Sequence, residues 1–207
     1  MAAASHMIDD SPPDPASENA RDVELMQLVQ KTDDHEAFRE LIERHQNAIV
    51  GTVAKMLGNT NDAEDLAQQV FLRLWKARHR YQPTAKFTTF LYTITRNLVF
   101  NETRRLSRRK ESSLDQRLED YELELPANPN QQPDREHLNQ ELRSAIDQAI
   151  AALPEKQRLA VILRRHQNLP YEEISTILDL TIPAVKSTLF RARGTLRESL
   201  AQYLTAQ

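Results

Sequence analysis

Residues 169–204 read LPYEEISTILDLTIPAVKSTLFRARGTLRESLAQYL. Apolar residues recur at helical spacing in two stretches, and Leu180-Thr181-Ile182-Pro183 lies between them. Thr181 can cap the second stretch, and Pro183 is tolerated there because it falls in the first turn. From Thr181 to Arg197 the chain has four basic residues and no acidic one. The pattern predicts a helix-turn-helix whose basic second helix suits a DNA major groove. The alternative is a helical hairpin with a solvated basic face.

The composition predicts an all-helical, intracellular protein. Only three of the 207 residues are glycine, whereas Ala, Leu, Glu, Gln and Arg are abundant. The chain has no cysteine, which excludes disulfides and thiolate sites. No apolar run approaches the roughly 20 residues that cross a bilayer, and residues 1–8 lack the apolar stretch of a signal peptide. We therefore expect a cytoplasmic location.

The net charge of −3 hides a strongly uneven distribution. Residues 96–110 contain six basic side chains against the single acid Glu102, whereas residues 9–24 and 111–136 are acidic. Screening limits the reach of a charge to about 8 Å at physiological salt, so local patches decide whether a polyanion binds. Basic faces separated by acidic segments are compatible with nucleic-acid binding.

Composition and periodicity divide the chain into four parts. Residues 1–21 are expected to be a tag remnant followed by a disordered segment. Residues 22–106 show four helical patterns, one of which ends at Gly58, and form the first predicted domain. Residues 107–137 are acidic, contain three prolines and are predicted to be a flexible linker. Residues 138–204 form the second helical domain, with the helix-turn-helix at its end.

Four segments in this order carry a family resemblance. They are DAEDLAQQVFLRLW at residues 62–75, FTTFLYTITRN at 87–97, LPEKQR at 153–158 and VKSTLFRAR at 185–193. With them, the chain resembles an extracytoplasmic-function (ECF) sigma factor of bacterial RNA polymerase over residues 22–106 and 138–204. Two departures are that Asp179 stands where glycine is common in the turn, and Lys186 where arginine is frequent. The connection over residues 80–86 also differs from most members.

The resemblance implies a polymerase-binding face and a site for the minus-ten promoter element. Side chains of the third helix would grip a coiled coil of the largest polymerase subunit: Asp62, Asp65, Gln68, Gln69, Arg73 and Lys76. Asn97 and the loop 81–86 would hold an extruded base, and the polar stripe Thr89, Thr93, Asn97 would face the single strand. The full predicted minus-ten set is Tyr81, Lys86, Thr89, Thr93, Arg96, Asn97, Arg104 and Arg105.

The last helix would read the minus-thirty-five element as duplex DNA. The residues implied by the resemblance are Thr181, Lys186, Ser187, Phe190, Arg191 and Arg193. Phe190 could contact a thymine methyl group or pack inward, and we favour packing. Residues 155–167 are candidates for contact with the polymerase flap. Trp75, Phe71, Phe87 and Phe90 lie on apolar stripes and are predicted core residues.

No catalytic site, cofactor or metal centre is predicted, because the histidines are dispersed and no nucleophile lies beside a base. The expected partners are core RNA polymerase, promoter DNA in duplex and single-stranded form, and an anti-sigma protein. Two alternatives stay open at this point. An autonomous helix-turn-helix regulator would bind duplex DNA without polymerase, and an interaction adaptor would bind partner proteins but no DNA.

Overall fold

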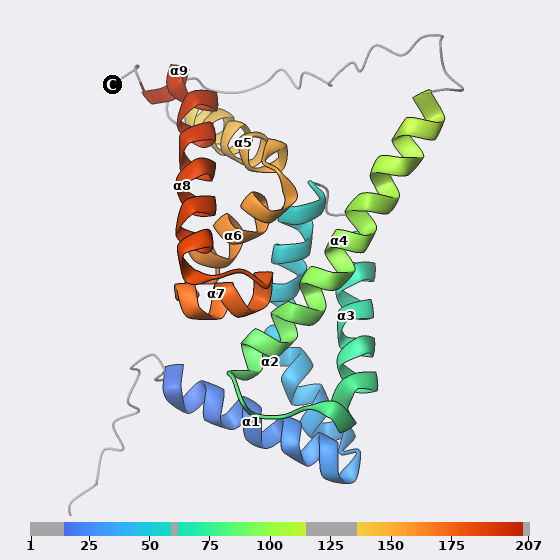
Figure 1. The fold of residues 1–207 in the computed structure, drawn as a ribbon. Coiled ribbons are helices and arrows are strands. Elements are labelled where there is room, and N and C mark those ends of the chain that lie inside the picture. The colour runs from blue at the N-terminus through green and yellow to red at the C-terminus, as the bar shows by residue number, and fades with distance from the viewer. Residues whose placement is uncertain (1–14, 59–61, 115–135, 205–207) are drawn as a thin grey trace, which may run out of the picture.

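The computed structural model describes residues 15–58, 62–114 and 136–204, and every regular element in these ranges is helical (Figure 1). This confirms the all-α prediction. The bounds are α1 Pro15–Thr32, α2 His35–Leu57, α3 Ala63–Ala77, η1 Arg78–Arg80 (a single 3-10 turn), α4 Phe87–Leu114, α5 Glu136–Ala152, α6 Glu155–Arg165, α7 Tyr171–Leu178, α8 Ile182–Ser199 and α9 Ala201–Leu204.

Helices α1 to α4 form an amino-terminal bundle around the predicted apolar stripes. The stripe of α2 is buried at Leu41, Ile49, Val53 and Met56. Asp34 caps the start of α2 by accepting from the Ala37 amide, and Gly58 ends it with a left-handed φ of 74°. These elements hold α3 and α4 side by side, and both carry predicted binding residues.

Helix α1 begins at Pro15, so the prediction of disorder up to residue 21 is wrong for residues 15–21. Tertiary contacts explain the difference. The carboxylate of Asp22 is buried and binds Arg44 Nε at 2.7 Å and His45 Nε2 at 2.8 Å. Asn19 accepts a hydrogen bond from the Phe87 amide at the start of α4. These partners lie more than 20 residues away, so a local composition argument does not find them.

Helices α5 to α8 form the carboxy-terminal unit. Thr181 caps α8 by accepting from the Ala184 amide, and Pro183 lies in its first turn, both as predicted. Asp179 ends α7 with a left-handed φ of 54°. Ile174, Ile177 and Leu178 of α7 pack inward with Val185 and Leu189 of α8, as the sequence indicated.

Helix α4 continues to Leu114, past the predicted start of the linker at residue 107 (Figure 1). The basic residues of its second half therefore lie on a regular helix. The rest of the predicted linker up to residue 135 lies outside the described residues.

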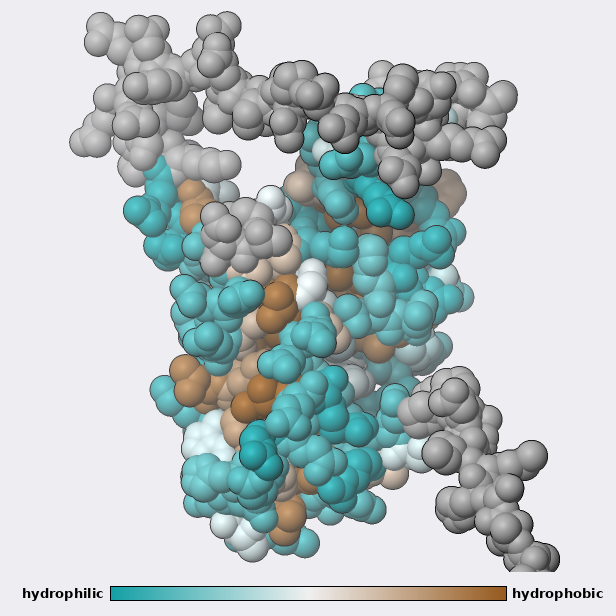
Figure 2. Space-filling view, turned by 180° about the vertical axis from the view of Figure 1, so that it is seen from behind, coloured by the Kyte–Doolittle hydropathy of each residue, from teal (hydrophilic) through white to brown (hydrophobic). Residues whose placement is uncertain are grey.

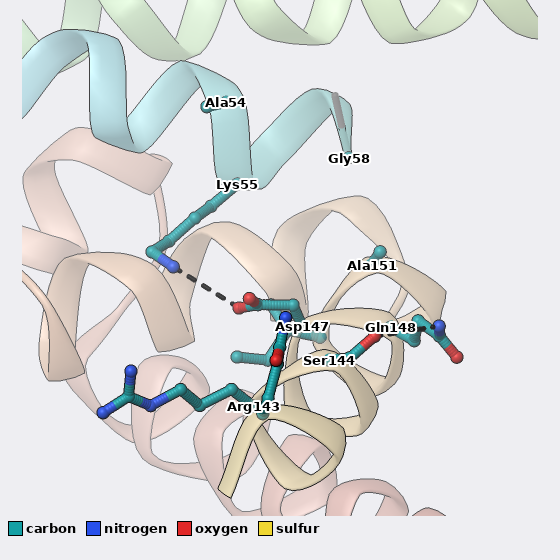
Figure 3. Close-up of a pocket in the computed structure, with 10 residues that line it drawn as sticks. Ala54, Lys55, Gly58, Arg143, Ser144, Asp147, Gln148 and Ala151 are labelled. Atoms are coloured by element: carbon teal, nitrogen blue, oxygen red, sulfur yellow. Dashed lines mark hydrogen bonds and ion pairs between the residues drawn. The ribbon is translucent and has the colours of Figure 1, made fainter. Parts of the chain in front are cut away.

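The amino-terminal bundle and the carboxy-terminal unit pack against each other, and their buried apolar residues form one cluster. Arg158 of α6 donates hydrogen bonds to the carbonyls of Met56 in α2 and of Ala151 and Leu153. A neighbouring hollow of about 520 Å³ lies between α2 and α5, where Lys55 Nζ is 3.5 Å from Asp147 Oδ1. Figure 3 shows the side chains that line it. The sequence suggested loosely tethered domains and did not indicate this contact.

The left-handed backbone of Asp179 at the end of α7 should affect stability. Asp179→Gly should raise the thermal midpoint by about 2 to 4 °C, because a left-handed backbone costs an L-residue roughly 1 kcal/mol. Asp179→Ala, the control, should lower the midpoint, because alanine cannot bond locally in that conformation. Thermal unfolding followed by circular dichroism tests this. A glycine variant less stable than the parent would contradict the account of the turn.

Two adjacent residues of α8 give a second prediction. Leu189 is 4% exposed and Phe190 is 78% exposed. Leu189→Ala should cost about 2 to 5 kcal/mol of unfolding free energy, because it leaves a core cavity. Phe190→Ala should change the unfolding free energy by less than about 0.5 kcal/mol. Urea denaturation measures both, and a large loss for Phe190→Ala would show that its ring packs inward.

Candidate nucleic-acid and polymerase interfaces

The outer face of α3 carries the predicted polymerase-binding residues. Ala63, Leu66, Val70 and Leu74 point into the bundle, which fixes the opposite face toward solvent. All six predicted side chains are exposed: Asp62, Asp65, Gln68, Gln69, Arg73 and Lys76. The same face exposes 60% of Leu72, which sequence reasoning missed. The sequence could have indicated this exposure, because Leu72 does not fall on the apolar stripe of the helix.

Trp75 anchors the end of α3. Its ring stacks on His35 at 4.9 Å and meets Phe38 edge-on at 4.9 Å, and the Arg78 guanidinium lies 4.4 Å from the ring centroid. Arg78 also bonds Asp33, and this partner holds the pKa of the Asp33 carboxyl below its usual range. The predicted packing role of Trp75 is confirmed, and the contacts fix where α3 passes into the loop.

A cationic pocket of about 520 Å³ lies between α3 and α4. It is lined by Arg73, Lys76, Ala77, Arg80, Ile94 and Asn97. The structure thus brings Arg73 and Lys76, predicted for polymerase, beside Asn97, predicted for DNA. Arg80 was not predicted, although it begins the connection that the sequence marked as unusual. An amide and several cations around one hollow can hold a polar base and its phosphates.

Tyr81, one of the predicted minus-ten residues, is buried in this structure. Its side chain is 2% exposed and packs against Phe87 and Phe90 at centroid distances of 6.4 and 5.3 Å. Burial raises the pKa of the Tyr81 hydroxyl. Gln30 of α1 donates to the Tyr81 carbonyl at 2.9 Å and fixes the loop. The loop sequence is polar, so the contact with α1 was not visible from it.

Tyr92 of α4 also belongs to the core. It is 5% exposed, and burial raises its pKa to about 12. The predicted core positions Phe71, Phe87 and Phe90 pack in the bundle or against it.

Helix α7 covers part of the polar stripe of α4. Thr89 is 2% exposed, and its Oγ1 donates to Glu173 Oε2 at 3.4 Å. Lys86 Nζ lies 2.8 Å from Glu173 Oε1, and Arg96 donates to the Ile177 carbonyl at 2.6 Å. Three predicted DNA contacts are therefore already occupied within the chain.

The remaining minus-ten candidates are more accessible. Asn97 is exposed and accepts hydrogen bonds from Arg96, whereas Thr93 is half-buried and donates to the Thr89 carbonyl. Arg104 and Arg105 are exposed on α4. Arg105 bonds both oxygens of Glu102 and so lowers the pKa of that carboxyl.

The outer face of α8 stays open to solvent. The predicted minus-thirty-five residues there are exposed or half-buried: Thr181, Lys186, Ser187, Phe190, Arg191 and Arg193. Arg191 donates to Ser187 Oγ at 3.1 Å, which aligns the two side chains along one face. The preference for packing Phe190 inward is wrong. Val185, Leu189 and Ala192 fill the inner face of α8, so the Phe190 ring points outward.

Other classes of site receive no support from the described part of the chain. No group of three or more His, Cys, Asp or Glu side chains in it could hold a metal ion. None of its helices is long and apolar enough to span a bilayer. The face in Figure 2 is mainly hydrophilic, with apolar side chains in small separate groups.

Two family models match the chain. Sigma-70 region 2 matches residues 41–109, which contain α3, the cationic pocket and most of α4. Sigma-70 region 4 matches residues 143–196, which contain the helix-turn-helix. The matches coincide with the two groups of predicted binding residues.

Full-length relatives match as well. The RNA polymerase sigma-H factor of Pseudomonas aeruginosa is 30% identical over 187 residues, covering 89% of this chain and 96% of its own. The ECF RNA polymerase sigma-E factor of Escherichia coli K12 is 32% identical over 179 residues, covering 86% and 93% respectively.

Solved structures share the fold. The sigma factor RpoE bound to the anti-sigma factor NepR from Bartonella quintana superposes with a TM-score of 0.61 at 22% identity, covering 79% of this chain and 96% of that one. CnrH in complex with the cytosolic domain of CnrY gives a TM-score of 0.64 at 20% identity, covering 88% and 98%. Together with the matched regions and relatives, this shows that the chain belongs to the ECF sigma factors, which direct bacterial RNA polymerase to promoters.

Proposed function

We propose that three faces of this sigma factor divide promoter recognition between them. The face of α3 binds core polymerase, the pocket between α3 and α4 traps one base of the minus-ten element, and α8 reads the minus-thirty-five element. Family membership favours this assignment over an autonomous regulator or an adaptor. The observation that carries it is the cationic pocket around Asn97.

The pocket suits a base extruded from single-stranded DNA. Its volume of about 520 Å³ lies within the range of sites that hold small molecules. The Asn97 amide can both donate to and accept from a Watson–Crick edge. Arg73, Lys76 and Arg80 supply positive charge for the flanking phosphates. Extrusion of a base costs a few kcal/mol, so a formed pocket lowers the free energy of the melted promoter.

The face of α8 suits duplex DNA. Lys186 and Ser187 lie near the start of the recognition helix, where base edges are usually met. Arg191 and Arg193 can neutralise phosphates, and the exposed ring of Phe190 can contact a thymine methyl group. The segment from Thr181 to Arg197 has no acidic side chain, so this part of α8 places no negative charge against an approaching phosphate backbone.

Protein partners would use the other faces. On α3, Leu72 supplies an apolar anchor amid polar and charged side chains, as expected where a few buried contacts carry most of the affinity. The proposed partner is the coiled coil of the largest polymerase subunit. Arg164, Arg165 and His166 are exposed at the end of α6 and are candidates for the flap. An anti-sigma protein is a further proposed partner, since RpoE, which shares this fold, is solved with the anti-sigma factor NepR.

Transcription tests the base pocket. Core polymerase with this chain should start transcripts selectively, and Asn97→Ala should reduce open-complex formation roughly tenfold, since a base contact contributes about 1 to 3 kcal/mol. Initial binding should change much less. Permanganate reactivity of unpaired thymines measures melting, and filter binding measures association. The control is Asn47→Ala, which removes an exposed amide on α2, away from the pocket. Equal losses in both steps, or from both variants, would contradict the pocket assignment.

The salt dependence of binding tests α8. If Arg191 and Arg193 neutralise phosphates, replacing each by alanine should reduce the slope of log K against log salt by about 0.9 in magnitude. Holoenzyme binding to a duplex minus-thirty-five fragment over a salt series gives the slope. Arg39→Ala, which removes an exposed charge on α2, is the control and should leave it unchanged. An unaltered slope in both α8 variants would mean that their charges face solvent in the complex.

A further inference from the structure

The seam between α4 and α7 is built around one carboxylate. The side chain of Glu173 is only 11% exposed. One of its oxygens lies 2.8 Å from Lys86 Nζ, and the other accepts from Thr89 Oγ1 at 3.4 Å. Both oxygens of this glutamate therefore face groups that belong to the other domain.

The contact continues along α7. One turn after Glu173, the carbonyl of Ile177 accepts a hydrogen bond from Arg96 at 2.6 Å. Thr89 and Arg96 are separated by two turns of α4, so one edge of α7 lies along the outer side of that helix. Figure 1 shows α7 beside the amino-terminal half of α4, in agreement with these bonds.

The chemistry of the contact resembles that of a bound nucleic acid. A carboxylate held by an ammonium and a hydroxyl occupies donors that would otherwise bind a phosphate or a base edge. Glu173 and a DNA strand cannot use Lys86 and Thr89 at the same time. The pocket around Asn97 and the face of α8 are not covered by this seam. The seam therefore blocks the proposed path of single-stranded DNA along α4 and leaves the other two proposed DNA-binding surfaces open.

Promoter binding also requires the seam to open. Two promoter elements that lie two turns of the DNA helix apart are separated by roughly 70 Å along the duplex. In this structure, by contrast, α4 and α7 are in contact. One protein cannot place α4 and α8 on both elements while the seam is closed.

We propose that Glu173 is an internal latch that holds α7 over α4 and keeps single-stranded DNA from Lys86 and Thr89 until the two domains separate. The proposal rests on the proposed minus-ten role of α4. Arg158 and the pair of Lys55 with Asp147 also bind the domains together, so the latch contributes one part of the closure.

Substitutions of Glu173 test the latch, because this residue belongs to neither proposed DNA face. Glu173→Gln keeps the size and removes the charge, and should raise the ratio of open to closed chains about threefold. Glu173→Lys places a cation against Lys86 and should raise the ratio roughly tenfold or more. The control is Glu172→Gln, which makes the same charge change at an exposed neighbour on the same helix.

The readouts are domain separation and DNA affinity of the full chain. The protein has no cysteine, so Gln46→Cys and Glu198→Cys, at exposed positions of α2 and α8, can carry a pair of dyes for energy transfer. Unlabelled chains are titrated against a fluorescein-labelled single-stranded DNA of mixed sequence. The Glu173 variants should lose energy transfer and bind the strand more tightly by the same factors, and Glu172→Gln should match the parent.

Unchanged energy transfer in both Glu173 variants would overturn the latch. Lost energy transfer without tighter strand binding would also overturn it, because the seam would then not obstruct the strand. Failure of the proposed function has a different signature. In that case the parent chain with core polymerase would not select start sites, whatever the dye-labelled variants show.

Discussion

The rest of the structure depends on one constraint: α4 packs into the bundle with one side and carries polar groups on the other. Its inner side buries Phe87, Leu91 and Leu98 in the amino-terminal bundle, which fixes the rotation of the helix. Because that side is fixed, Asn97 is held beside α3 and Arg96 is turned toward α7. A small rotation of α4 would remove both the pocket and the seam. Apolar packing on one side thus determines which polar groups can meet DNA on the other.

The distribution of charge explains how a chain of net charge −3 can bind a polyanion. Cations line the pocket between α3 and α4 and the outer face of α8, where they lie within a screening length of any bound strand. At the seam, the largely buried Glu173 pairs with Lys86, whose side chain is half exposed. In the proposed latch, this carboxylate also controls whether Lys86 is free to bind DNA. Among the solved structures that share the fold, RpoE is bound to the anti-sigma factor NepR and CnrH to the cytosolic domain of CnrY.

Local rules predicted much of the fold and part of the site. The cap at Thr181, the proline in the first turn of α8 and the left-handed Asp179 depend on neighbouring residues, so the sequence specifies them. The burial of Tyr81 and the early start of α1 depend on partners far along the chain, which periodicity does not show. The outward turn of Phe190 follows from α8 needing only its inner face for packing. The seam could not be predicted, because nothing in the composition of α7 marks Glu173 as a contact of α4.

The most direct test follows the outer side of α4 from the free protein into the transcription complex. Asn101 is exposed and lines a small hollow with Leu178 and Asp179, so a photoreactive amino acid placed there samples whatever covers α4. In the free chain it should capture residues of the α7 turn. In the open complex with polymerase and promoter it should capture the non-template strand instead. Capture of α7 in both states, or of DNA in neither, would contradict the account.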